Sequence, residues 1–560
     1  MATIQFKGKE IVRNHHLTVP YHELVPDEKK SFTKKVSLND NLIIHGDNLL
    51  ALKALLPTYA GKVKCIYIDP PYNTGNEKWA YNDNVNSPMM KDWLGKVVDK
   101  DDLTRHDKWL CMMMPRLKLL RELLRDDGVI FISIDEGNES QRGNECHRLK
   151  MLMDEVFQGN FVGQFVWRKK EGGGQTDQFF VTEHEVVLVY AKSPDFKWQD
   201  EEIPDTEASY NKQDKDGKFS AVKLAKWGTG AHKEDRPKQY FPIKDPDGKN
   251  YFPVAPDGRD GRWRVGKDRM QSLLESNLIY WDKRNGKWVP YEKVYFEIGQ
   301  NKVIKERSIL FDLVFTGDAS KELTEIFGVK DIFDNPKPHL LIQYFLTYSS
   351  QKESIILDSF AGSGTTAHAV LALNKEDKGN RKFILVQIPE EIEKDKPAYS
   401  LGFRQVIDIT AERARRVIRG VKDAKDDDLQ KGLGGSFSFY ELGKPIDVER
   451  ILKGKDLPTF AEMARYIFYT ATGEEFNEKK VNEKTGLIGE SKEYQVYLLY
   501  KPDMEYLKST ALTLERAEAL GKFAGKKRLV FAPAKYLDQE HLERLHIDFA
   551  QLPFEIYQKQ

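Results

Sequence analysis

The sequence predicts an α/β protein whose core is a mostly parallel β-sheet with helices on both faces. Two observations predict this class. Short, continuous apolar runs, which suit strands buried on both sides, alternate with segments in which apolar residues have helical spacing. The order strand, turn, helix appears at 41–192 and returns at 336–419, with a different kind of sequence in between.

The first stretch supplies most of the expected strands. In chain order we expect a strand, turn and helix at 41–55, a strand at 62–75 that two prolines stop, a helix at 107–127, a strand at 129–135 and two β-rich runs at 161–167 and 185–192. The helix at 107–127 is predicted from apolar residues at 110, 114, 117, 120 and 124, and Gly128 is expected to end it.

The second stretch repeats the pattern. We expect a helix at 336–349, a strand at 355–357 with a glycine-rich turn and a helix after it, a strand at 381–390, and a helix that ends near four arginines at 413, 415, 416 and 419. Residues 423–435 are polar and glycine-rich, which predicts a linker. Strands at 494–500 and 528–534 then predict a small C-terminal α/β domain at 436–560.

Between the two stretches, residues 193–325 have the texture of an inserted domain. Turn dipeptides recur there and helical periodicity is lost. Between Tyr210 and Arg269 there are 15 Lys or Arg against 9 Asp or Glu, together with eight aromatic residues. The full division that we predict is an N-terminal segment at 1–39, a catalytic half at 40–192, the insertion at 193–325 and a second half at 326–422, followed by the linker and the C-terminal domain.

Composition excludes several classes of protein. The 560 residues include 87 Lys or Arg and 87 Asp or Glu, so net charge says nothing about a polyanion partner. The three cysteines are far apart, which argues against a disulfide framework and a structural zinc cluster, and we predict no metal site. We see neither a secretory signal nor an apolar run long enough for a bilayer, so the expected compartment is the cytoplasm, without membrane contact.

The first chemical signal is Asp69-Pro70-Pro71-Tyr72 at the end of a predicted strand, where ligands sit in open α/β sheets. The two prolines fix the backbone and lack N–H groups, which leaves carbonyl oxygens and the Asp69 carboxylate as acceptors. Beside the flat ring of Tyr72, these acceptors suit an exocyclic amino group on a stacked base. The alternative is that Pro-Pro merely ends a strand, and these four residues by themselves favour it.

The second signal is the glycine-rich turn between the strand at 355–357 and the next helix. Glycines there permit a tight turn and let a ligand approach the backbone closely. The turn lacks a complete GxGxxG pattern and no P-loop lysine follows, so a nucleotide phosphate is not the expected ligand, and a purely structural turn is the alternative. The residues concerned are Asp358, Ser359, Phe360, Ala361, Gly362, Ser363, Gly364, Thr365 and Thr366.

Together, the two motifs resemble those of the DNA amino-methyltransferases that use S-adenosyl-L-methionine. The catalytic motif precedes the cofactor motif, the order of the β-type permutation, and the NPKPHLL segment at 335–341 matches the block before the glycine-rich turn. DPPYNTG, SIILDSFAGSGTT and FRQVIDITAERARRVI further resemble the Mod subunits of type III restriction-modification systems. The resemblance implies a Rossmann-like methyltransferase sheet that carries an inserted target-recognition domain, and methylation of adenine N6 in double-stranded DNA. It also implies a homodimer and a separate helicase-nuclease (Res) partner.

Carried over by motif, the resemblance assigns roles to individual residues. Asp69 and the Pro70 carbonyl accept hydrogen bonds from the adenine amine, Tyr72 stacks on the flipped base, and Pro71 completes the motif. Phe360 to Thr366 surround the methionine part of the cofactor, and Asp358 precedes them. Asp47 lies beside the cofactor adenine or, as an equal alternative, stabilises a helix N-terminus. Where relatives often have an acid for the ribose hydroxyls, this chain offers Gln387 or Glu390.

DNA contacts are predicted in two places. Trp167, Arg168 and Lys169 precede a glycine-rich loop at 172–174, and a solvated surface loop is the alternative there. The insertion is the expected reader of the DNA sequence, through residues that include Lys226, Trp227, Arg262 and Arg264. Three other functions stay open: a solitary or type II methyltransferase of adenine N6 or cytosine N4, a recognition and docking subunit with vestigial methylation, and a protein glutamine methyltransferase. The last class has Asn first in the motif and lacks a large insertion.

Overall fold

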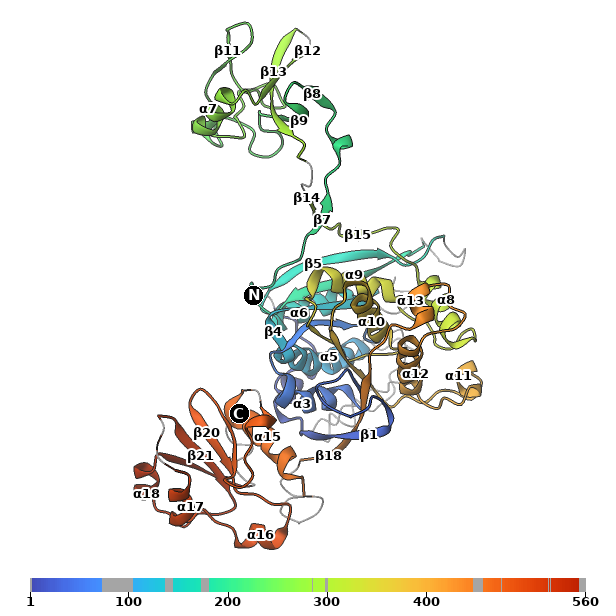
Figure 1. The fold of residues 1–560 in the computed structure, drawn as a ribbon, viewed down its shortest axis with the longest axis vertical. Coiled ribbons are helices and arrows are strands. Elements are labelled where there is room, and N and C mark those ends of the chain that lie inside the picture. Colours follow the sequence, from blue (N-terminus) through green and yellow to red (C-terminus); the bar gives the residue numbers. More distant parts are fainter. Residues whose placement is uncertain are drawn as a thin grey trace. The chain divides into compact units, whose positions relative to one another are not determined.

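The computed structural model describes residues 3–72, 104–135, 145–172, 181–284, 286–297, 301–446, 457–474, 476–521, 523 and 525–552. The chain forms two compact units (Figure 1). Unit 1 consists of residues 1–199 and 307–560, and unit 2 consists of residues 200–306. The continuation of the Asp-Pro-Pro-Tyr motif at 73–75, Gly173 and Gly174 of the predicted loop, and the C-terminal residues 553–560 lie outside the described ranges.

Unit 1 is built around a ten-stranded sheet, in which six of the nine neighbouring pairs are parallel. The predicted class, a mostly parallel α/β sheet, is thereby confirmed. In spatial order the strands are β1 (His22–Phe32), β18 (Phe437–Pro445), β2 (Leu42–His45), β17 (Lys382–Gln387), β16 (Ile355–Asp358), β3 (Val63–Ile68), β4 (Leu124–Ile134), β6 (His184–Ala191), β5 (Phe161–Arg168) and β15 (Ile309–Leu310).

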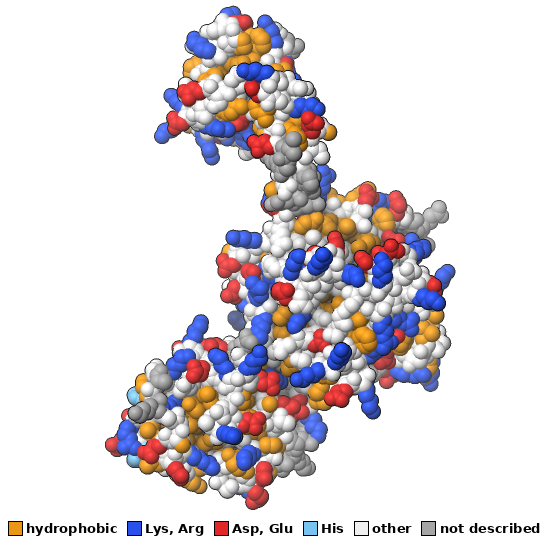
Figure 2. All heavy atoms as spheres, viewed as in Figure 1, with side chains coloured by type: hydrophobic (Ala, Val, Ile, Leu, Met, Phe, Trp, Pro, Cys, Tyr) orange, Lys and Arg blue, Asp and Glu red, His pale blue; other side chains and the backbone are white. Residues whose placement is uncertain are grey.

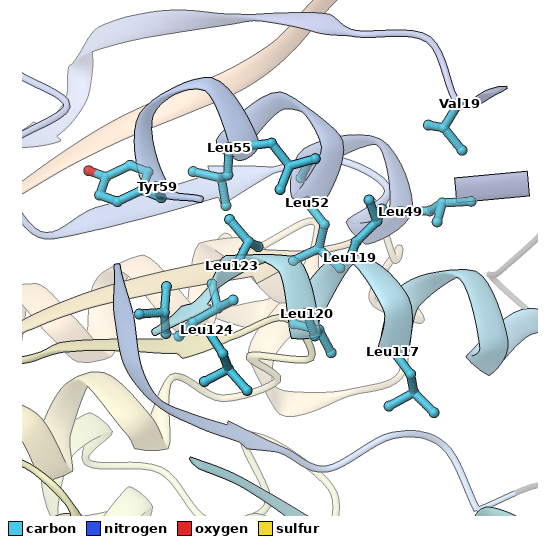
Figure 3. Close-up of a cluster of buried hydrophobic side chains, with 14 of the residues drawn as sticks. Val19, Leu49, Leu52, Leu55, Tyr59, Leu117, Leu119, Leu120, Leu123 and Leu124 are labelled. Atoms are coloured by element: carbon cyan, nitrogen blue, oxygen red, sulfur yellow. The ribbon is translucent and has the colours of Figure 1, made fainter. Parts of the chain in front are cut away.

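Helices cover both faces of this sheet, because consecutive residues of a strand point to opposite sides. Ile44 packs with one hydrophobic cluster and its neighbour Ile43 with the other. The first cluster includes leucines of α3 (Asn48–Tyr59) and α5 (Thr104–Leu123), which interdigitate in Figure 3, and of α6 (Cys146–Val156). The second cluster is formed with α8 (Thr316–Phe327), α9 (His339–Ser349), α10 (Thr365–Asp377) and α12 (Val406–Arg419).

One helix ends earlier than its apolar spacing predicts. We expected α5 to continue to Gly128, but it ends at Leu123 and β4 begins at Leu124. The carbonyls of Glu122 and Leu123 accept hydrogen bonds from the N–H groups of Gly61 and Lys62. Because the turn before β3 satisfies these carbonyls, the helix ends where the neighbouring strand begins.

Unit 2 is shorter than the predicted insertion at both ends. Residues 193–199 and 307–325 belong to unit 1, where β15 pairs with β5 and α8 packs in the second hydrophobic cluster. Unit 2 has its own core around the fully buried Trp263. Its elements are β7 (Glu201–Pro204), β8 (Lys212–Asp214), β9 (Gly217–Lys223), β10 (Ile243–Lys244), β11 (Asn250–Tyr251), α7 (Lys267–Glu275), β12 (Ile279–Arg284), β13 (Lys287–Tyr295) and β14 (Asn301–Ile304).

The predicted boundaries at 39 and 422 also differ from the structure. Strands β1 and β18 join the central sheet, so the sheet uses residues from both flanking segments. The predicted linker contains a helix, α13 (Asp427–Lys431), and Leu429 of this helix is buried. Gly432 ends this helix, so the glycine-rich composition of the segment does not indicate a flexible linker. The C-terminal part has a second sheet of β19 (Leu487–Glu490), β20 (Tyr494–Leu498), β21 (Lys527–Ala532) and β22 (Ile547–Gln551), with α15 (Phe460–Thr472), α16 (Met504–Ser509), α17 (Leu514–Ala519) and α18 (Gln539–Arg544).

None of the helices in the described ranges has the length and apolar character that a membrane crossing requires.

Candidate functional site

The central sheet has a topological switch point between β16 and β3. From β16 the chain passes through α10 to β17 on one side, and from β3 it reaches α5 and β4 on the other side. Connections that leave two adjacent parallel strands in opposite directions open a crevice at their carboxyl ends, where open α/β sheets bind ligands. Asp69–Tyr72 directly follow β3, and the glycine-rich turn directly follows β16. The two motifs are therefore brought together.

The side chains of Asp69 and Tyr72 contact a third residue, Lys337. The Tyr72 hydroxyl donates to Asp69 Oδ1 at 2.6 Å, and Lys337 Nζ donates to Asp69 Oδ2 at 2.9 Å and to the Tyr72 hydroxyl at 2.8 Å. Lys337 Nζ also lies 5.1 Å from the centre of the Tyr72 ring. About a quarter of the Asp69 side chain is exposed (26%), against 10% of Lys337, so the carboxylate lies at the mouth of the site and the ammonium behind it.

Lys337 belongs to a chain of alternating charges. It pairs with Glu185 on β6 at 3.2 Å, Glu185 pairs with Lys169 at 3.2 Å, and Lys169 pairs with Asp135 at 2.8 Å. Neither Lys337 nor Glu185 was predicted as a site residue. The available signal was the NPKPHLL block, whose lysine is Lys337, but only the fold shows that it reaches a carboxylate 268 positions earlier in the chain.

These contacts shift the pKa of each group in a definite direction. Burial raises the pKa of Asp69, and Lys337 counteracts only part of that rise. Burial works against the charged form of Lys337, but the Asp69 and Glu185 carboxylates outweigh it and raise the lysine pKa. Burial also works against ionised Glu185, yet Lys337 and Lys169 lower its pKa. Lys337 and Glu185 are therefore held charged, and Asp69 is the carboxylate that most readily takes up a proton.

The prolines of the motif are fixed by their surroundings. Pro70 is buried, and the carbonyl of Pro71 accepts a hydrogen bond from Trp109 Nε1 at 2.7 Å. Trp109 lies on α5 and is fully buried. The backbone that carries Asp69 and Tyr72 is thus anchored to the helix that follows in the chain.

The glycine-rich turn is held by hydrogen bonds from its own side chains. Asp358 Oδ1 accepts from the Phe360 N–H at 3.0 Å, and Asp358 Oδ2 accepts from the Thr366 hydroxyl at 2.5 Å. Gly364 has a φ of +79°, and a Cβ there would lie 3.0 Å from the Thr410 carbonyl oxygen. A residue with a side chain is excluded at this position both by backbone conformation and by space.

Three of the residues predicted to bind cofactor also support the turn. Asp358 and Thr366 are buried and bonded to each other, and burial raises the pKa of Asp358 to about 7. Gln387 accepts a hydrogen bond from the Gly362 N–H at 2.8 Å. Glu390 is exposed and lines a cleft of about 1100 Å³ together with Phe333, which lies beside Gly362. Of the two residues predicted for ribose contact, Glu390 is therefore the one that faces open space.

Asp47 forms the N-cap of α3. Its Oδ1 accepts from the N–H groups of Leu49 at 2.8 Å and Leu50 at 3.4 Å. Arg116 lies 3.5 Å from the same oxygen. The helix-stabilising alternative that the sequence left open accounts for these contacts.

The predicted DNA contacts divide into buried and exposed residues. Trp167 is fully buried and donates its indole N–H to the Val314 carbonyl at 2.7 Å, so the expected DNA contact there is corrected to a structural role. Arg262 is corrected in the same way, since it is buried in unit 2 against the Gly230 carbonyl. Lys169 is paired within the site, and Arg168 lies over the Phe311 ring at 4.5 Å.

The remaining predicted contacts stay open to solvent on unit 2. Trp227 is 54% exposed, with Lys223 Nζ 3.9 Å from the centre of its ring, Lys226 is half-buried and Arg264 is exposed. Lys and Arg side chains are spread over the visible face of unit 2 in Figure 2. This distribution is compatible with contacts to phosphate groups.

One cluster offers the atoms of a metal site. Ligand atoms of Glu322, His339 and His368 lie within 4.8 Å of one another. Arg413, however, donates from Nη2 to Glu322 Oε1. Because the guanidinium already neutralises the carboxylate, a cation in the same place would face a fixed positive charge, and the donor set does not fit a metal well.

Comparison with known proteins agrees with this geometry. A model of the DNA methylase family (N6_N4_Mtase) matches residues 63–396. The chain is 34% identical over 486 residues to the Mod subunit of the type III restriction-modification enzyme EcoPI of Escherichia phage P1, which covers 80% of this chain and 73% of the relative. It is 30% identical over 588 residues to the StyLTI Mod subunit of Salmonella typhimurium, with coverage of 98% and 84%. It is 34% identical over 419 residues to the type II methyltransferase M.KpnI of Klebsiella pneumoniae, with coverage of 72% and 94%.

Because the family model matches more than half of the chain, the chain belongs to the DNA methylase family and is a DNA methyltransferase that uses S-adenosylmethionine. Within this class it is similar to Mod subunits over most of its length. By its identity to the EcoPI and StyLTI Mod subunits it also belongs to the family of type III Mod subunits.

Proposed function

We propose that the crevice between β3 and β16 is where adenine N6 receives its methyl group. Asp69 and the Pro70 carbonyl hold the amine, Tyr72 stacks on the base, and Phe360–Thr366 hold the methionine part of S-adenosylmethionine. The observation that carries the proposal is the position of Lys337. Its side chain contacts Asp69 and Tyr72, and its carbonyl accepts a hydrogen bond from Thr365 of the glycine-rich turn at 3.1 Å. One residue thus joins the two halves of the site.

The chemistry that this arrangement supports is simple. Bound S-adenosylmethionine supplies an electrophilic methyl group. The adenine amine is a poor nucleophile because its lone pair is delocalised into the ring, and acceptors on its hydrogens offset the charge that develops on nitrogen. As nitrogen gains a bond to carbon it must lose a proton, and Asp69, whose pKa burial raises, is placed to accept it.

The target base must leave the double helix for this contact to occur. N6 is otherwise held in pairing and stacking, and a carboxylate beside an aromatic ring can contact it only when the base is extruded. Both Asp69 oxygens already accept a hydrogen bond, from Tyr72 and Lys337. A carboxylate has about four lone-pair sites, so it can also accept from the amine without losing these partners.

Mapping of N6-methyladenine in DNA from an expressing strain tests the proposed reaction, since it reports base, site and strand together. Tyr72→Phe and Tyr72→Ala test the stacking role. The phenylalanine variant keeps the ring but loses the hydroxyl contacts with Asp69 and Lys337, and it should keep most of its activity. The alanine variant should lose it. Equal activity of the two variants would refute stacking by Tyr72.

We propose further that unit 2 reads the DNA sequence. The support is its independent core, the excess of positive charge between Tyr210 and Arg269, the exposed Trp227 and Arg264, and the half-buried Lys226. Exchange of residues 200–306 with the corresponding unit of a relative that has another specificity tests this. Methylation at the donor's site supports the proposal, and an active hybrid that keeps the original site contradicts it.

The similarity to Mod subunits supports two partners and a compartment. We propose a second copy of this chain, a Res helicase-nuclease subunit, and the cytoplasm, where the DNA of a bacterial cell lies. Light scattering of the purified chain and co-purification with the product of a neighbouring nuclease gene measure the first two. A second candidate function is that of a type II methyltransferase, which the similarity to M.KpnI favours. The two candidates differ in whether a helicase-nuclease associates with the chain.

A further inference from the structure

A buried arginine supports the glycine-rich turn from the side of α12. Arg413 is fully buried, and its Nη1 donates to the hydroxyls of Ser363 at 3.1 Å and Thr365 at 2.8 Å. A guanidinium presents its donors in a fixed plane, so two hydroxyls bonded to one nitrogen are held at a defined spacing. The conformation of the turn therefore depends on where Arg413 is placed.

Glu322 on α8 determines that placement. It accepts from Arg413 Nη2 on one oxygen, and on the same oxygen from His368 Nδ1 at 2.8 Å. Its other oxygen accepts from His339 Nδ1 at 2.7 Å. The two imidazole rings stack with centres 4.1 Å apart, and burial lowers the pKa of His368 to about 4, so this ring is neutral near pH 7. Glu322 thus pairs directly with the Arg413 guanidinium, and the neutral ring of His368 adds a second hydrogen bond.

The same network reaches the catalytic motif. Thr365 receives a hydrogen bond from Arg413 and donates one to the carbonyl of Lys337. The side chain of Lys337 in turn contacts Asp69 and Tyr72. The Thr365 hydroxyl is therefore a junction between the support of the turn and the residue that holds Asp69.

We propose that Arg413 and Glu322 are positioning residues for methyl transfer, which set the glycine-rich turn and Lys337 in register with each other. Both act through the hydroxyls of Ser363 and Thr365. The proposal rests on the role proposed above for the turn. It predicts that loss of the Arg413–Glu322 pair weakens cofactor binding and slows turnover, because displacement of a reacting group by about 1 Å can cost on the order of 100-fold in rate.

The central test compares two arginines on the same helix. Arg413→Met removes the donors to Ser363 and Thr365. Arg416→Met is the matched control, because Arg416 also ties α12 to α8, through the carbonyls of Ile326 and Phe327 at 3.0 and 3.2 Å, but makes no contact with the turn among those found in the described residues. Calorimetry with S-adenosylmethionine and steady-state kinetics should show at least a 10-fold weaker affinity and a lower kcat for Arg413→Met, and values within 2-fold of the parent for Arg416→Met.

Two further variants keep the test decisive. If Arg413→Met does not fold, Glu322→Gln replaces it in the test, because it preserves the size of the side chain, and it should raise the KM for S-adenosylmethionine. Arg413→Lys keeps a positive charge and should retain more activity than Arg413→Met. Parent-like KM and kcat in a folded Glu322→Gln or Arg413→Met protein would overturn the inference. Gly362→Val separates the proposed role of the turn from the positioning role of Arg413 and Glu322. If this variant binds cofactor normally, the proposed role of the turn is wrong. If it loses binding while the Arg413 and Glu322 variants retain it, only the positioning role is wrong.

Discussion

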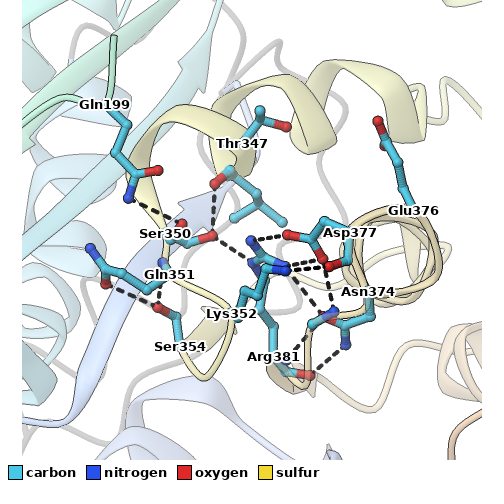
Figure 4. A network of polar contacts seen from close by, with 12 residues as sticks. Gln199, Thr347, Ser350, Gln351, Lys352, Ser354, Asn374, Glu376, Asp377 and Arg381 are labelled. Atoms are coloured by element: carbon cyan, nitrogen blue, oxygen red, sulfur yellow. Dashed lines mark hydrogen bonds and ion pairs between the residues drawn. The ribbon is translucent and has the colours of Figure 1, made fainter. Parts of the chain in front are cut away.

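Each end of strands β16 and β17 carries a network of buried charged residues, and the two networks differ in how far apart their members lie in the sequence. At the amino-terminal end, Arg381 is 4% exposed, its Nη atoms pair with both oxygens of Asp377 at 3.0 and 2.8 Å, and its Nε donates to the Ser350 hydroxyl at 2.9 Å (Figure 4). Asn374 donates to the Arg381 carbonyl and accepts from its N–H. All these partners lie within 31 positions of one another in the chain.

At the carboxyl-terminal end, the network draws on Asp69, Glu185 and Lys337, which are far apart in sequence. It also leaves a partly exposed carboxylate, Asp69, with a raised pKa at the mouth of the crevice. In the amino-terminal network, Arg381 is paired with Asp377, and the contacts hold together the segments that lead into the two strands. The difference teaches that long sequence separation, together with a carboxylate whose pKa is raised, distinguishes the reactive end of the strands from the structural end.

Of the substitutions in the two networks, Asp69→Ala should have the largest effect on the rate of methyl transfer. Loss of an oriented acceptor at a centre that develops charge costs about 100- to 1,000-fold in rate. Cofactor affinity and melting temperature should stay close to those of the parent, because the side chain lies at the mouth of the site. Single-turnover methylation of a duplex measures the effect, and near-parental turnover would exclude Asp69 as the acceptor.

Lys337→Met should cost about 10- to 100-fold in turnover near neutral pH, because it removes a neighbour of Asp69 and Tyr72. It should also change the pH profile. Lys337 holds down the pKa of Asp69, so without it that pKa rises further. An acceptor must be ionised, so activity is lost as pH falls through this pKa, and the acidic limb of kcat/KM should move to higher pH. Lys337→Arg should keep the limb in place; an unmoved limb in Lys337→Met would contradict the assignment.

Arg381→Met should act on stability alone. It leaves Asp377 without its bidentate partner, and we expect a loss of about 2–3 kcal/mol, below the usual range for a fully buried pair because Asp377 is partly exposed. Denaturant unfolding measures this loss, while turnover of the folded protein at low temperature should stay within about 2-fold. If the variant lost catalysis as severely as the Lys337 variant, the distinction between a structural network and a reactive network would be wrong.

Asp358→Asn should have the smallest effect at low pH, where the parent carboxyl is also neutral, and its effect should be visible as a pH dependence. Burial raises the pKa of Asp358 from 3.8 to about 7, so the folded chain binds a proton that the unfolded chain releases between these values. Stability from this group is therefore fully present below about pH 4 and falls as pH rises to about 7, by at most about 1.4 kcal/mol per pH unit. Thermal unfolding between pH 4.5 and 6.5 should show a shallower fall in the variant than in the parent, and parallel curves would contradict the raised pKa.

The sequence was sufficient for the fold class and for the two motifs, because both depend on local patterns. Asp69–Tyr72 and Phe360–Thr366 are contiguous, and apolar runs reveal the strands before them. Lys337, Glu322 and Arg413 could not be assigned roles, because only the sheet order brings them to the crevice. Trp167 beside basic residues indicated DNA contact, but the alternation of a strand turns the indole inward. The predicted boundaries of the insertion differ from the structure for a similar reason. Strand β15 pairs with β5, and residues 307–325 therefore belong to unit 1.

The position of β18 has a practical consequence for attempts to shorten the chain. This strand pairs with β2, which leads into Asp47, and with β1, so it lies between the N-terminal segment and the rest of the sheet. A fragment cut at 422, where the sequence motifs end, would expose the hydrogen-bonding edge of β2 and leave β1 without a neighbour. Exposed edges of this kind pair with other chains. A minimal methyltransferase should therefore extend at least to Pro445, and fragments that end earlier should aggregate.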